Sequence, residues 1–174
     1  YGSGRYPGLE VIRLLSETVI PVASPELLAS NPLETPEDLS RHILLHDGSP
    51  DADDSCPDWA MWLAARGIKS VDGARGPRFN QSSLVIEAAA NGRGVALAKR
   101  TLAQADLESG RLVAPLQIAT AVDFAYYLVH PKAKGRLPQV KAFVSWIEAE
   151  ALAHEQALLA IDNGSQSTKV TIFD

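Results

Sequence analysis

The sequence predicts an α/β fold with a parallel or mixed sheet. Short apolar runs that are typical of strands alternate with segments of helical pattern along the 174 residues. Residues 75–97 contain a strand, a helix and a second strand in direct succession, which is the unit from which parallel sheets are built. The composition is ordinary for a globular domain, at 46% hydrophobic and 21% charged. The chain is long enough for one domain and short for two.

The elements are predicted in order along the chain. Strands are expected over residues 11–23, 42–46, 112–118 and 124–130, and helices over residues 26–30, 35–39, 58–66, 101–109 and 137–159. The turn at 35–39 has a strong start, because Thr35 is a good N-cap and Pro36 suits the first helical position. Trp59 and Trp62 lie three residues apart on one helix face, so we expect them in the core rather than as a ligand platform.

The strand–helix–strand unit is the most informative stretch. Phe79 ends its first strand, and Ser82 or Ser83 is expected to cap the helix, because a serine hydroxyl can accept from free backbone N–H groups. The glycine-containing turn at 91–94 ends the helix before the second strand. A helix that begins at the carboxyl edge of a sheet presents free N–H groups there, and two hydroxyls accompany them. This arrangement favours the binding of a small anion.

Charge, cysteine usage and missing motifs exclude several classes of protein. The net charge is −5 and the sixteen basic residues are scattered, which argues against a broad nucleic-acid-binding surface. The single cysteine, Cys56, excludes an internal disulfide and fits a reducing cytoplasm. No stretch approaches the ~20 apolar residues of a membrane span, and the first residues do not resemble a signal peptide. The sequence lacks a nucleophile elbow, a metal-ligand set and a phosphate-binding loop of the Walker type, so we expect a cytoplasmic, non-enzymatic protein without metal, cofactor or membrane partner.

Five segments in one order resemble a known family. They are RYPGLEVIRLLSETVIPVASPELLA, TPEDLSRHILLHD, DWAMWLAARG, GPRFNQSSLVIEAAANGRGVALAKR and LESGRLVAPL. Together they resemble the effector-binding domain of LysR-type transcriptional regulators. The Gly-Pro-Arg-Phe strand before the Ser-Ser helix is similar to the branch of glycine-cleavage activators. The resemblance covers residues 1 to about 151 and is specific, because many short matches fall in one order.

The resemblance implies a periplasmic-binding-protein-like fold of two α/β subdomains with mixed sheets, which hold a small metabolite between them. It also implies that the domain pairs as a homodimer or tetramer. The hydroxyl-rich start of the predicted helix favours an amino acid or another small carboxylate as the metabolite. DNA is expected as a partner only through an N-terminal helix-turn-helix domain, which nothing in this sequence matches. The opening elements of the first subdomain are expected to be missing too, which leaves that subdomain incomplete.

When the family's ligand contacts are carried over, the candidates for effector binding are Ser82, Ser83, His46, Asn80, Gln81 and Tyr1. The two serines lead, because hydroxyls at a helix start can donate to a carboxylate; simple capping is the alternative. His46 follows at a strand end, where ligands bind in open α/β sheets, or else is a solvated loop histidine. Asn80 and Gln81 either contact a polar effector or cap the strand.

The last residues resemble a second family. Residues 160–174 follow the pattern D-x-G-x-x-S-T-K-x-x-x-F-D and are predicted to form a strand, a turn and a second strand. This hairpin resembles the phosphate-binding start of FGGY carbohydrate kinases, in which the matching residues would be Asp162, Gly164, Ser167, Thr168 and Lys169. The sequence therefore divides into a partial effector-binding domain at 1–157 and an extra tail at 158–174. The tail is either the start of an ATP-dependent sugar kinase fused to a regulator remnant or an accidental match.

Overall fold

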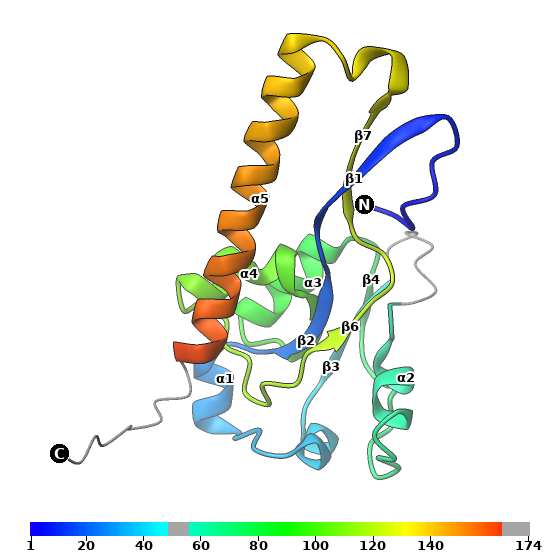
Figure 1. Ribbon diagram of the computed structural model, residues 1–174. Helices are drawn as coiled ribbons and strands as arrows, with labels where there is room; N and C mark the ends of the chain where they lie inside the picture. The colour runs from blue at the N-terminus through cyan, green and yellow to red at the C-terminus, as the bar shows by residue number, and fades with distance from the viewer. Residues whose placement is uncertain (49–55, 165–174) are drawn as a thin grey trace, which may run out of the picture. The chain divides into compact units, whose positions relative to one another are not determined.

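The structure is a computed structural model that describes residues 1–48 and 56–164 (Figure 1). The chain divides into two compact units. The larger unit contains residues 17–124, and the smaller unit combines residues 1–16 with the chain from Ala125 onward. Because the smaller unit draws on both ends of the chain, the backbone passes between the units twice.

A five-stranded sheet forms the centre of the larger unit. Its strands lie in the order β4-β3-β5-β2-β6 and cover, in that order, Arg78–Phe79, Leu44–Asp47, Val95–Lys99, Thr18–Val22 and Thr120–Ala121. Strand β3 is parallel to both of its neighbours, β4 and β5. Strand β2 runs antiparallel to β5 and to β6. The sheet is therefore mixed, as the sequence predicts.

Helices cover the two faces of this sheet (Figure 1). The first core cluster includes α3 (Ser82–Ala90) and α4 (Arg100–Glu108). The second includes α1 (Pro25–Ser30), the 3-10 helix η1 (Pro36–Arg41) and α2 (Trp59–Ala64). Side chains of consecutive strand residues point to opposite faces. Leu45 accordingly packs in the cluster of α3 and α4, and Leu44 packs in the other cluster.

The predicted strand–helix–strand unit is present as β4, α3 and β5. Helix α3 packs on β3, which lies between these two strands. Val85, Ile86 and Ala89 form its buried face, whereas Leu84 is 47% exposed. The turn after the helix contains Gly92 at a φ of 69°, a left-handed conformation that glycine adopts without steric cost.

Helix α2 supplies the aromatic centre of the second cluster. Trp59 and Trp62 are each 1% exposed and pack edge to face, with ring centroids 5.7 Å apart. The Trp59 Nε1–H donates to the carbonyl of Leu45 at 3.0 Å, which ties α2 to β3. The Arg66 guanidinium lies 3.8 Å from the Trp62 ring centroid and donates to Thr120 Oγ1 at 2.8 Å. The expectation that both tryptophans are core residues is confirmed.

The smaller unit contains an antiparallel pair of strands and the long helix of the chain. Strand β1 (Leu9–Leu15) pairs with β7 (Tyr126–Pro131), and α5 (Pro138–Gly164) packs against β1. No described helix is long and apolar enough to cross a membrane.

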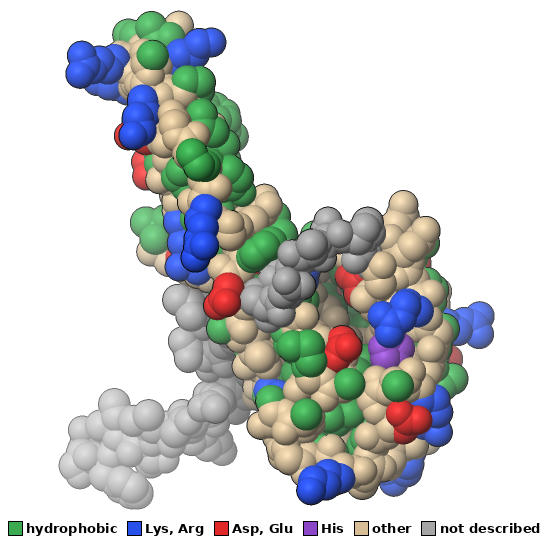
Figure 2. Space-filling model, turned by 90° about the vertical axis from the view of Figure 1, so that its right-hand side faces the viewer, with side chains coloured by type: hydrophobic (Ala, Val, Ile, Leu, Met, Phe, Trp, Pro, Cys, Tyr) green, Lys and Arg blue, Asp and Glu red, His purple; other side chains and the backbone are tan. Residues whose placement is uncertain are grey.

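Basic side chains gather where β7 gives way to α5, around the 3-10 helix η2 (Lys132–Lys134) (Figure 2). The four exposed cations of this turn are Lys132, Lys134, Arg136 and Lys141.

The predicted strand at 11–23 is wrong in extent. The run at 11–23 forms two strands, because the backbone leaves one unit at Ser16 and enters the other at Glu17. The buried Glu17 carboxylate accepts from the backbone N–H of Thr18 at 2.9 Å and of Thr101 at 3.2 Å, which ends the extended run.

The predicted strand at 112–118 is not a strand. Its described backbone makes one bridge, between Val113 and Ala23. Pro115 has no N–H to donate to a sheet ladder, and Gln117 adopts a positive φ of 49°.

The tail also differs from its prediction where the structure describes it. Helix α5 continues through Gly164, so residues 160–164 are helical rather than extended, and Asp162 and Gly164 belong to this helix. Ser167, Thr168 and Lys169 lie outside the described residues.

A glycine substitution tests the packing of the loop before β4. Gly76 has a φ of 125°, and a Cβ there would overlap the carbonyl oxygen of Leu44. We expect Gly76→Ala to lower the free energy of unfolding by about 3 kcal/mol or more, because steric overlap adds to the left-handed strain. Gly110→Ala is the matched control, since Gly110 also has a positive φ but open space around its Cβ; we expect a cost of about 1–2 kcal/mol. Equal losses in urea unfolding would contradict this packing.

The buried histidine His42 predicts acid sensitivity. Its side chain is 3% exposed, and burial lowers the pKa of His42 below its ordinary value of 6.5. Protonation of His42 therefore favours the unfolded chain. The contribution of the neutral imidazole to the free energy of unfolding is fully present above about pH 6.5. It is lost as the pH falls toward the lowered pKa, by at most about 1.4 kcal/mol per pH unit. Urea unfolding at pH 7.5 and 5.5 should show this loss, and His42→Gln should reduce it. His130→Gln, at a half-exposed position on β7, should leave this loss of stability unchanged. If His42→Gln also left it unchanged, the acid sensitivity would belong to other groups.

Candidate functional site

The carboxyl ends of β3 and β4 form one edge of the larger unit. In the parallel register, His46 pairs with Arg78 and Asp47 pairs with Phe79. The Gly48 N–H donates to the carbonyl of Phe79 at 2.7 Å, which holds the two strand ends together. The residues after Phe79 therefore begin α3 at the same edge. This is the position at which open α/β sheets bind ligands.

The start of α3 differs in one respect from its prediction. Gln81 is the N-cap and has no side-chain capping bond, and Ser82 is the first helical residue. Neither serine is the cap, and the Ser82 hydroxyl instead donates to Asp47 Oδ2 at 2.5 Å. The Asp47 carboxylate is thereby held beside the helix start, where the positive end of the helix dipole favours an anion. Sequence reasoning missed Asp47, although it directly follows the predicted strand 42–46.

The other polar candidates at this edge are open to solvent. Asn80, Gln81 and Ser83 are all exposed, and Ser83 lies in the first turn of α3. The first N–H groups of any helix have no acceptor within that helix. The edge thus combines a carboxylate, a hydroxyl, two amide side chains and backbone donors. Such a set can hold a small polar molecule through hydrogen bonds.

His46 is a buried residue rather than a solvated loop histidine. It is 4% exposed, and its Nε2 donates to the carbonyl of Arg75 at 3.0 Å, which requires the proton to be on Nε2. Its backbone N–H donates to the carbonyl of Pro77 at 3.0 Å. His46 therefore fixes the loop that leads into β4, directly beneath the edge. The packing of this loop over β3 could not be read from the sequence.

Tyr1 belongs to the smaller unit. Its ring centroid lies 5.1 Å from that of Tyr126, and the side chain is 40% exposed. The structure therefore places five of the six candidates in the larger unit and Tyr1 in the other.

An ion-pair network fixes α3 against α4. Arg111 donates from Nη2 to both Glu87 carboxylate oxygens at 2.9 Å and from Nη1 to Asp106 Oδ1 at 2.7 Å. The hydrogen bond from Arg111, with a second from Asn91, lowers the pKa of Glu87. Sequence reasoning missed this network. Among the described residues, no group of three or more His, Cys, Asp or Glu side chains is placed to hold a metal ion.

Comparison with known proteins identifies the family. Residues 1–152 match the LysR substrate binding domain. The glycine cleavage system transcriptional activator of Escherichia coli K12 is 41% identical over 157 residues, covering 90% of this chain and 50% of the activator. The transcriptional regulator DsdC of the same organism is 32% identical over 139 residues, covering 79% of this chain and 44% of DsdC. The chain thus spans about half the length of the curated relatives it matches.

Solved structures give the same result. The effector domain of the regulator AmpR of Pseudomonas aeruginosa has a TM-score of 0.68 at 28% identity, covering 91% of this chain and 73% of that domain. The AmpR effector-binding domain of Citrobacter freundii has a TM-score of 0.67 at 25% identity, covering 87% of this chain and 72% of that domain. These proteins are transcriptional regulators rather than enzymes, and they give no support to the sugar-kinase alternative. The chain belongs to the LysR substrate-binding domain family, with the periplasmic-binding-protein-like fold that the resemblance implied.

Proposed function

We propose that this domain senses a small metabolite bearing a carboxylate, an amino acid or a small organic acid, at the edge formed by β3, β4 and α3. The observation that carries the proposal is the start of α3, where the exposed Ser83 hydroxyl accompanies a helix N-terminus at the carboxyl ends of parallel strands. Backbone N–H groups and hydroxyls together favour a bound carboxylate. The family match supports a sensor role for the domain.

The residues at the edge take distinct roles in this proposal. The Ser83 hydroxyl and backbone N–H groups in the first turn of α3 donate to the carboxylate of the effector. Asn80 and Gln81 contact its polar substituents. His46, which is buried, maintains the shape of the edge and acts as a positioning residue.

In the longer protein, we propose that effector binding favours one conformation of the domain and thereby changes transcription. The domain would assemble as a homodimer or tetramer in the cytoplasm, and DNA would be bound by a helix-turn-helix domain outside this sequence. We place the end of the effector-binding domain at about residue 157, within α5.

Ligand-dependent stabilisation tests the sensor role. In a thermal melt with a panel of amino acids, small carboxylates and Mg-ATP, we expect one carboxylate-bearing compound to raise Tm, because binding to the folded state alone stabilises it. Ser83→Ala should lose most of that shift, whereas Ser145→Ala, at an exposed position on α5, should retain it. A shift with Mg-ATP and none with any carboxylate would contradict the proposal.

Asp47 distinguishes the two effector classes. An amino acid has an ammonium group that Asp47 can accept from, so Asp47→Asn should weaken its binding by about threefold to tenfold. A simple carboxylate is repelled by Asp47, so the same substitution should leave its binding unchanged or strengthen it. Isothermal titration of the compound found in the melt, against the wild-type and Asp47→Asn proteins, separates the two. A loss of the folded state in Asp47→Asn would be visible by circular dichroism.

A further inference from the structure

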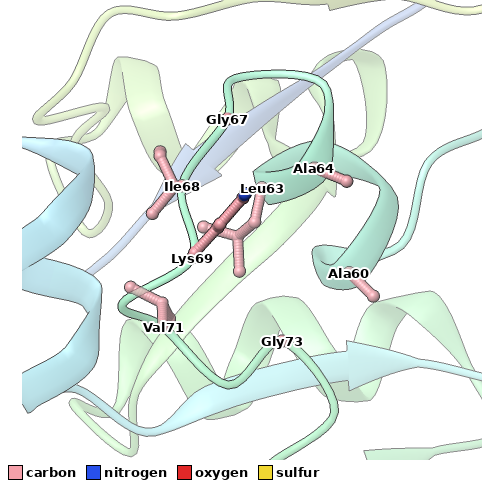
Figure 3. A pocket seen from close by; sticks show the side chains of 8 residues that line it. All are labelled: Ala60, Leu63, Ala64, Gly67, Ile68, Lys69, Val71 and Gly73. Atoms are coloured by element: carbon pink, nitrogen blue, oxygen red, sulfur yellow. The ribbon is translucent and has the colours of Figure 1, made fainter.

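A separate pocket lies on the larger unit, between α2 and the loop that follows it (Figure 3). Its volume is about 300 Å³. It is lined from α2 by Ala60, Leu63 and Ala64 and from the loop by Gly67, Ile68, Lys69, Val71 and Gly73. None of these residues belongs to the edge at which β3 and β4 end.

The pocket exists because small residues lie where α2 and the following loop face each other. At one end, Gly73 lies so close to α2 that a Cβ would be 2.8 Å from Ala60 Cα. At the other end, Gly67 turns the chain away from the helix with a φ of 68° and open space around it. Ala64 contributes no more than a methyl group. The loop therefore lies close against α2 at Gly73 and leaves space beside Gly67 and Ala64.

The walls of the pocket are formed in advance. Leu63 and Val71 are 2% and 8% exposed and belong to the core cluster of α2. The Ile68 N–H donates to the carbonyl of Leu63 at 3.1 Å, which fixes the loop as it leaves the helix. A pocket that is apolar and already formed requires little ordering when a ligand enters.

The apolar lining of the pocket is accompanied by one charged residue, Lys69. Lys69 is the single charged residue among the described residues that line the pocket (Figure 3). Among the described residues, no acidic side chain lines the pocket. The nearby Asp72 accepts from the backbone N–H of Ala74 at 3.0 Å within its own turn. A ligand that matches this pocket has an apolar body and one anionic group.

We propose that this pocket is an accessory binding site for a small carboxylate with an aromatic or branched apolar body. The proposal is independent of the sensor site at the strand ends. The volume of the pocket is at the lower limit for small-molecule sites. The ligand is therefore small, and its dissociation constant is expected to be about millimolar.

Methyl NMR of the full chain tests the proposal with three probes of one shape: phenylacetate, phenylacetamide and 2-phenylethylammonium. Phenylacetate should shift the methyl signals of Leu63, Ile68 and Val71 saturably. It should bind about threefold more tightly than the neutral amide, because of Lys69, and the cation should bind least. Lys69→Gln should remove the preference for the anion over the amide while both still bind.

Ala64→Leu fills the pocket from an exposed helical position and should abolish the saturable shifts. Ala105→Leu, at an exposed position on α4, is the matched control and should bind as the wild type does. Ser83→Ala should also bind normally, which separates this site from the sensor site. The proposal is overturned by an absence of saturable shifts, by equal binding of the cation, by retained binding in Ala64→Leu, or by a loss of these shifts in Ser83→Ala.

Discussion

The two-sided burial of β3 is the constraint on which the larger unit depends. Leu44 and Leu45 are adjacent and each 1% exposed, yet they pack in different core clusters. A strand that buries both faces needs helices on both sides, and a strand parallel to both neighbours needs a crossover helix. Helix α2 lies in the connection from β3 to β4 and packs in one core cluster, whereas α3 connects β4 to β5 and packs in the other. The N-terminus of α3 consequently lies at the carboxyl ends of β3 and β4.

The polar edge follows from this arrangement. A helix start requires acceptors for its free N–H groups, and parallel strands bring loops from distant parts of the sequence to the same place. Asp47 reaches Ser82 across 35 residues of sequence because the β3–β4 register aligns their strands. His46 then fixes the loop before β4 from below. The edge combines a fixed carboxylate with open donors, which suits a molecule of mixed charge better than a simple anion.

Local sequence signals predicted the elements well where packing did not compete. The burial of Trp59 and Trp62 follows from helical spacing, and the structure has both in the core. Helix α2 ends at Ala64, two residues before its predicted end. The segment at 112–118 was predicted as a strand from its apolar residues, but Pro115 and the turn at Gln117 prevent a ladder.

The candidate site was predictable in position and only partly in detail. The place of Ser82 and Ser83 at a helix start is readable from the sequence. The preference of Ser82 for Asp47 over capping depends on a tertiary contact, as does the burial of His46 under its loop. The break at Ser16 and Glu17 also depends on tertiary structure, because it lies where the chain passes between the two units.

The start of α3 is the proposed binding place of the effector's carboxylate. The most direct measurement is a ¹H–¹⁵N NMR titration of the chain with glycine, serine, acetate and lactate, in which the backbone amides are followed individually. Our account predicts saturable shifts for one of these compounds that are largest at the amides of Ser82 and Ser83, where hydrogen bonds to the carboxylate form. Saturable shifts centred on another part of the chain, with these two amides unchanged, would contradict it.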